Sequence, residues 1–209
     1  MPLRRKKAPS RVRLTRERVI ATALRLLDSE GIEALSMRRL ARELGVEAMS
    51  LYSHVDSKQT LLAGVLDLAL EGFSMPAERD GDWQSWIREW MRAARKIFAD
   101  HPNLCQAVRS GAPLGPRVLQ MIDALLAKLQ AAGLDGKMQL RVWHLLRAYL
   151  FGAVAQETIN PTNMPLTDLM ACCPHLVPVL TTQHCCDFER LFEEGLEVIL
   201  AGTAALGRG

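Results

Sequence analysis

Apolar residues recur every three or four positions along most of the chain. This spacing gathers them on one face of a helix. It predicts helices over 15–31, 37–44, 57–73, 82–101, 116–133, 135–158 and 187–201. No stretch alternates apolar and polar residues for long, so we predict no strand. The pattern therefore favours an all-α fold.

Capping and helix-breaking residues mark the ends of these helices. Ser, Thr and Asp side chains can accept a hydrogen bond from the first helical turn, and they stand at Thr15, Ser36, Ser57, Asp82 and Asp187. Gly, His-Pro or Asn-Pro follows several of the apolar stripes. Residues 103–115 are poorly patterned, and residues 162–186, with three prolines, are predicted to form a long loop.

Two short helices joined by a tight turn are predicted between Leu35 and Leu62. The first follows Ser36, carries a regular apolar face and ends at Gly45. In the second, 47–54, most side chains other than Leu51 are free to face a partner. This is the layout of a helix-turn-helix, whose second helix reads DNA bases. An ordinary helical hairpin with a solvated face is the alternative.

The same stretch resembles the TetR (tetracycline-repressor) family. The resemblance is carried by Gly31, Leu35-Ser36-Met37-Arg38, Leu40-Ala41, Leu44-Gly45-Val46, Leu51-Tyr52, His54-Val55, Lys58 and Leu61-Leu62. It extends over about 15–70, and the chain from Asp82 onward is similar to the tetracycline-repressor subgroup in length and pattern. The resemblance implies a homodimeric, ligand-responsive transcriptional regulator, usually a repressor, that binds a double-stranded operator and is released by a small-molecule effector.

The resemblance also assigns DNA-contacting positions. It places base reading on Ala48, Met49, Ser50 and Ser53, with Arg38 reaching a base edge, and phosphate contacts on Tyr52, His54 and Lys58. Ala48 is too short to read a base by hydrogen bonding, so an operator sequence cannot be borrowed from a relative. For Tyr52 and His54, partial packing against the preceding helix is the alternative.

The distribution of charge also separates the N-terminal part of the chain from the remainder. Residues 1–60 hold 13 Lys and Arg against 7 Asp and Glu, whereas the remainder holds 13 against 16. The excess of positive charge near the N-terminus favours a polyanionic partner. We expect a basic flexible arm over 1–14, a helix-turn-helix domain over 15–60, and a helical effector-binding and dimerisation domain over 61–209.

Several classes of protein are disfavoured. The sequence has no apolar run of 18 residues and no signal-peptide pattern, so we expect a cytoplasmic protein with no membrane partner. Five cysteines, an odd number, argue for reduced thiols. The common catalytic motifs, such as G-x-S-x-G and H-E-x-x-H, are missing, so an enzyme is not expected.

The second domain combines apolar residues with a few polar ones, as small-molecule pockets do. The candidate ligand-binding residues are Trp86, Trp90, Arg109, Trp143, His144 and Arg147. For each tryptophan, a place in the core is the alternative. Where the tetracycline-repressor subgroup uses a Glu and a His for a magnesium–drug complex, this chain has Gln156 and no His near Arg109. We therefore expect neither magnesium nor another cofactor.

The resemblance places dimerisation on the helices at 135–158 and 187–201. Their apolar stripes exceed what one side of each helix needs for its own core. The candidate interface residues are Leu146, Leu150, Phe192, Leu196 and Ile199.

Cysteine and histidine residues are concentrated between Cys172 and Cys186. Four such side chains can bind zinc, but adjacent cysteine pairs lack the usual Cys-x₂₋₄-Cys spacing. Apolar thiols in a loop are the favoured interpretation, and no metal site is predicted. A metal- or thiol-sensing regulator is the alternative function.

Overall fold

The computed structural model describes residues 13–78, 82–109, 111, 113–157, 173, 175 and 187–207. All regular secondary structure in these ranges is helical. The α-helices are α1 (Arg16–Ala34), α2 (Met37–Leu44), α3 (Ala48–Leu51), α4 (Lys58–Ala69), α5 (Trp83–Asp100), α6 (Asn103–Arg109), α7 (Pro116–Ala131), α8 (Gly136–Glu157) and α11 (Phe188–Leu206). A short 3-10 helix, η1 (Leu70–Gly72), follows α4. The predicted all-α fold is confirmed.

All five predicted N-caps are formed. In each, a side-chain oxygen accepts a hydrogen bond from the backbone N–H three residues on, which satisfies a donor that the helix itself leaves unpaired. The caps are Thr15, Ser36, Ser57, Asp82 and Asp187. Local sequence therefore sets where these helices begin.

Several ends differ from the prediction. The first helix continues past Gly31 to Ala34, with a break at Gly31, where φ is 78° and ψ is 176°. The second helix of the predicted helix-turn-helix, the recognition segment 47–54, is helical only over Ala48–Leu51. The segment 103–115 contains an unpredicted helix, α6, because its core contacts come from other helices and leave only a weak pattern.

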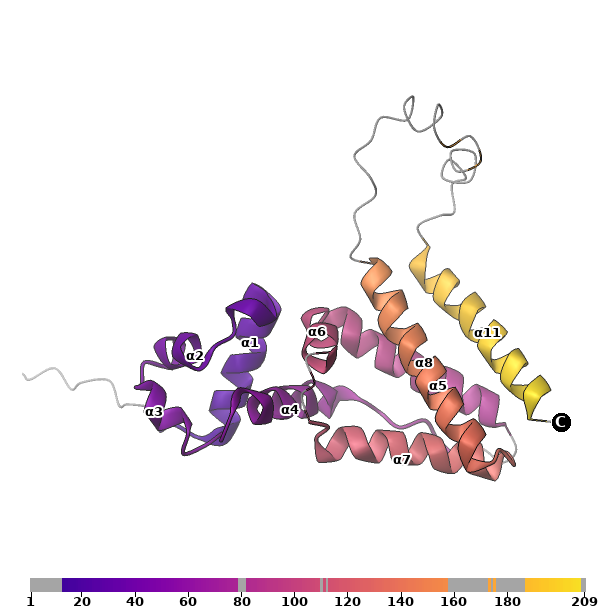
Figure 1. Ribbon diagram of the computed structural model, residues 1–209, viewed down its shortest axis with the longest axis horizontal. Helices are drawn as coiled ribbons and strands as arrows, with labels where there is room; N and C mark the ends of the chain where they lie inside the picture. Colours follow the sequence, from indigo (N-terminus) through magenta and orange to yellow (C-terminus); the bar gives the residue numbers. More distant parts are fainter. Residues whose placement is uncertain are drawn as a thin grey trace, which may run out of the picture.

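The molecule has two ends joined by α4 (Figure 1). Helices α1, α2 and α3 lie at one end, and α5, α7, α8 and α11 lie at the other. Helix α4 packs against α1 and also against α6 and α7, while α11 packs against α8. The predicted domain boundary after residue 60 falls inside α4, which is one continuous helix.

Ion pairs connect α5 to α8 and α11. Arg92 of α5 donates two hydrogen bonds to Glu193 of α11, at 2.7 and 2.6 Å, and Arg88 forms a similar pair with Glu197. Arg95 pairs with Glu157 of α8 at 2.9 Å. Bidentate arginine–carboxylate pairs fix orientation as well as distance, so these helices form one unit.

Candidate functional site

The helix-turn-helix is formed by α2, the turn at Gly45 and α3. Gly45 adopts the left-handed conformation, with φ at 68°, and its N–H bonds to carbonyls of the last turn of α2. Such a turn favours glycine because a side chain there is strained. Leu51 is fully buried and anchors α3 against the domain, while the opposite face of α3 is open.

The predicted base-reading residues are accessible. Met49 is 77% exposed, and Ser50 and Ser53 are also exposed. The Ser53 hydroxyl donates to the Ser50 carbonyl at 2.8 Å, which orients it along the helix. Ala48 is only partly exposed. The open face of α3 can therefore meet base edges through small polar groups and one long apolar side chain.

The predicted phosphate-contacting residues differ in their surroundings. Tyr52 is exposed and His54 is half-buried. Lys58 is exposed, but its Nζ also donates to the Ile32 carbonyl at 3.3 Å. Arg38 is exposed on α2. Close by, Arg13 and Arg18 line a groove with Ser50 of α3, and sequence analysis did not single out Arg18.

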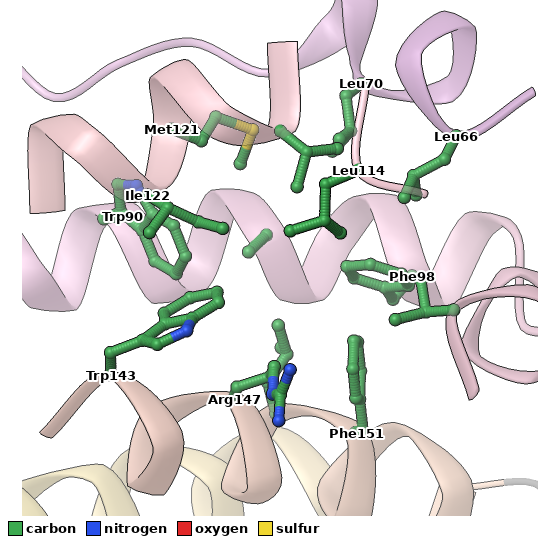
Figure 2. Close-up of a pocket in the computed structure, with 14 residues that line it drawn as sticks. Leu66, Leu70, Trp90, Phe98, Leu114, Met121, Ile122, Trp143, Arg147 and Phe151 are labelled. Atoms are coloured by element: carbon green, nitrogen blue, oxygen red, sulfur yellow. The ribbon is translucent and has the colours of Figure 1, made fainter. Parts of the chain in front are cut away.

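A cavity lies in the other half of the molecule, between α4, α5, α6, α7 and α8. Its volume is about 90 Å³, and its wall is almost entirely apolar. Figure 2 shows Trp90 and Phe98 on one helix facing Trp143, Arg147 and Phe151 on another. Arg147 is the one charged side chain among the described residues of the wall. Its guanidinium lies over the Trp143 ring, 5.8 Å from the centroid.

Of the six predicted ligand-binding residues, three line this cavity: Trp90, Trp143 and Arg147. The other three do not. Trp86 is buried one turn before Trp90, where Lys128 covers its ring. Arg109 and His144 are exposed, and His144 Nδ1 lies 3.3 Å from a guanidinium nitrogen of Arg147.

None of the other wall residues was predicted to bind ligand: Leu66, Leu70, Ala94, Phe98, Val108, Leu114, Val118, Met121, Ile122, Leu150 and Phe151. A signal was present for some of them. Trp90, Ala94 and Phe98 are four residues apart on α5, and Trp143, Arg147 and Phe151 are four apart on α8. Side chains four residues apart lie on one side of a helix. The residues four and eight positions after each tryptophan could therefore have been predicted to line the same cavity.

The five predicted dimer residues lie mostly inside the subunit. Leu146, Leu150, Phe192 and Leu196 are at most 3% exposed in the single chain. A second chain could not reach them without opening the fold, so these four are core residues and the prediction needs correction. Ile199 is half-buried. The large apolar residues that α8 and α11 leave exposed are Leu140, Leu145, Leu191, Val198 and Leu206.

The cysteine and histidine cluster at 172–186 lies outside the described residues, apart from Cys173 and His175. Within the described ranges, no group of three or more His, Cys, Asp or Glu side chains could hold a metal ion. None of the described helices is both long and apolar enough to cross a membrane.

An exposed helix-turn-helix on one body, with a separate apolar cavity in the other, defines the class of ligand-responsive DNA-binding regulators. Comparison with known families agrees. Residues 19–65 match the bacterial regulatory proteins of the tetR family, and residues 75–206 match the tetracyclin repressor-like C-terminal domain. The chain belongs to the TetR family of transcriptional regulators and is a ligand-responsive DNA-binding repressor.

Individual relatives span most of the chain. An HTH-type transcriptional regulator of Saccharopolyspora erythraea is 31% identical, over 92% of this chain and 85% of its own. The class E tetracycline repressor of Escherichia coli is 30% identical, over 92% of each chain. The crystal structure of ActR of Streptomyces coelicolor in complex with actinorhodin has a TM-score of 0.79 and 32% identity, over 94% and 99% of the two chains.

Proposed function

We propose that the protein binds a palindromic operator as a homodimer and leaves it when a largely apolar small molecule occupies the cavity between α4 and α8. The observation that supports this proposal is that α4, which connects the two ends of the molecule, contributes to the cavity wall. Leu66 of α4 and Leu70 of η1 line the cavity (Figure 2). Helix α4 also packs against α1 of the DNA-binding body.

Through this arrangement, a ligand in the cavity can change DNA binding. A ligand shifts an equilibrium only by its different affinity for the two states. A molecule that touches Leu66 and Leu70 would favour one position of α4. Because α4 holds α1, that preference would change where α3 lies relative to the DNA.

The size and chemistry of the cavity limit the ligand. Ligand pockets usually measure roughly 300–1,000 Å³, so a cavity of about 90 Å³ must widen to hold one. Leu114, exposed on the loop before α7, is the wall residue best placed to move aside. Aromatic rings and leucines favour an apolar ligand, and Arg147 can anchor one acceptor or anionic group at the edge.

The homodimer is supported by exposed apolar side chains on α8 and α11. Leu145 and Val198, on the two helices, are 49% and 73% exposed. Exposed apolar residues that gather on neighbouring helices are typical of subunit interfaces. A two-fold dimer would present two copies of α3 to two half-sites of a palindrome.

Operator selection tests this function. Purified protein is mixed with sheared genomic DNA at physiological salt, and the retained fragments are sequenced and footprinted. We expect a protected palindrome whose affinity falls steeply with salt, because contacts to phosphates release counterions. A Met49→Ala, Ser50→Ala double variant is altered only on the open face of α3. It is measured in parallel and should lose the sequence preference. Equal retention of all fragments by the unmodified protein would contradict the proposal.

A further inference from the structure

Side chains from the cavity domain, which comprises α5, α6, α7, α8 and α11, contact α1 just before its break at Gly31. A helix that breaks leaves carbonyls of its last turn without their usual donors. The Asn103 side-chain amide supplies donors from α6: its Nδ2 donates to the Leu27 carbonyl at 2.9 Å and to the Asp28 carbonyl at 3.3 Å. Its Oδ1 would lie 4.0 Å from a Cβ added at Gly31.

A second contact lies beside the first. His101 Nδ1 is 2.9 Å from Oδ2 of Asp28. His101 is fixed in turn because it caps the end of α5, where its N–H bonds to the Ile97 carbonyl. Two neighbouring residues at the corner between α5 and α6 thus meet the same turn of α1.

Helix α6 also reaches the cavity. Val108, near its C-terminal end, is part of the cavity wall. Leu104 and Ala107 are buried, so α6 is firmly packed between α1, α4 and α5. A path through one short helix therefore runs from the cavity wall to α1, in addition to the direct contact between α4 and α1.

We propose that His101 and Asn103 are positioning residues that clamp the end of α1 and set the orientation of the DNA-binding body relative to the cavity domain. The inference rests on the proposed operator binding by a dimer. In a dimer, each clamp helps to set the separation of the two copies of α3. An occupant of the cavity that displaces Val108 would loosen the clamp at the other end of α6.

The decisive variant is Asn103→Asp, which keeps the shape of the side chain but replaces the donor with an oxygen that faces two carbonyl oxygens. Gln106→Glu is the matched control, since it makes the same change of charge at an exposed position of α6. Asn103→Ala removes the donor without adding charge, and it carries the test if Asn103→Asp does not fold.

The readout is discrimination between operator spacings. Affinities are measured for the selected operator and for duplexes whose half-sites are one base pair closer or farther apart. We expect the unmodified protein and Gln106→Glu to prefer the natural spacing sharply. In Asn103→Asp that preference should fall by about tenfold, the equivalent of one to two hydrogen bonds, and amide exchange over 27–34 should be faster. A purely structural role would lower the melting temperature and leave the spacing preference of the folded protein unchanged.

An unchanged spacing preference in folded Asn103→Asp would overturn the inference, whether or not its amide exchange is faster. This result is distinct from failure of the proposed function, in which the unmodified protein itself would prefer no operator over scrambled DNA. The exchange of residues 27–34 would still decide whether the clamp exists.

Discussion

Arg38 and Arg39 are neighbours on α2 with opposite surroundings. Arg39 bonds to Glu30 at 2.6 Å and to Glu43 at 2.9 Å, and hydrogen bonds to these two carboxylates raise its pKa. Its positive charge is therefore largely neutralised by carboxylates of the protein itself. Arg38 is exposed on the surface of α2.

The two arginines should therefore respond differently to truncation. Arg38→Ala should weaken operator binding by about 1–3 kcal/mol and relax specificity, as expected for a base contact. Arg39→Ala, the matched loss of charge, should change operator affinity and stability little, since exposed ion pairs contribute little. Fluorescence anisotropy with operator and scrambled duplexes measures both effects. Equal losses for the two variants would indicate that only net charge matters.

Cys105 offers a prediction about reactivity. Burial raises the pKa of its thiol to about 11. The reactive species is the thiolate, and a group with this pKa remains almost entirely neutral at pH 8. We expect Cys105 to resist alkylation by iodoacetamide in the folded protein at pH 8 and to react quickly in urea, as followed by peptide mass spectrometry. Rapid labelling of the folded protein would contradict its buried position.

Sequence reasoning found residues of the right kind but could not always choose between faces of a helix. Trp86 and Trp90 share a stripe, yet only Trp90 reaches the cavity. On α8 and α11 the most regular apolar residues, such as Leu146 and Phe192, belong to the core of the subunit. Periodicity identifies a buried face, whereas which neighbour buries it depends on the packing of several helices.

At the scale of elements, α4 is packed unusually closely against the start of α7. A Cβ added at Gly115 would lie 2.3 Å from the Asp67 carboxylate of α4. The glycine allows Asp67 to approach the N-terminus of α7, where the helix dipole favours negative charge. A methyl group at position 115 would therefore push the Asp67 carboxylate aside.

Gly115→Ala should push Asp67, and α4 with it, away from the start of α7. Overpacking of this kind usually costs about 1–3 kcal/mol of folding stability, and operator binding should weaken because α4 moves, while the protein remains folded. Asp67→Ala added to Gly115→Ala should restore much of the affinity, because it removes the atoms that the methyl group meets. Gly72→Ala, at a glycine with open space around it, serves as control. Operator titration of the three variants, with thermal unfolding in parallel, checks this. Failure of the double variant to recover would show that α4 is not displaced.

Most elements followed from the sequence because their caps and apolar stripes are local. Helix α6 did not, since seven residues give too short a pattern to recognise. The recognition segment was placed correctly, and its shortness arises because the chain turns after Leu51 so that Val55 can join the core. The cavity depends on five helices meeting, which no single stretch of sequence describes.

At the scale of the whole molecule, the exposed apolar residues of α8 and α11 should hold two subunits together. Val198→Glu would bury a charge in such an interface, and we expect the dimer to dissociate and operator affinity to fall with it. Leu119→Glu makes the same change at an exposed position of α7 and should leave both unchanged. Light scattering at micromolar concentration and operator titration measure the two properties. A dimeric Val198→Glu variant would place the interface elsewhere.

The most direct test of the account measures linkage between the cavity and the operator. Aromatic compounds are screened for one that raises the melting temperature of the protein but not that of a Trp143→Ala variant. The operator affinity is then titrated with and without that compound, and the affinity for the compound with and without operator. We predict that each affinity changes by the same factor, about 5- to 150-fold. A compound that occupies the cavity and leaves operator affinity unchanged would contradict it.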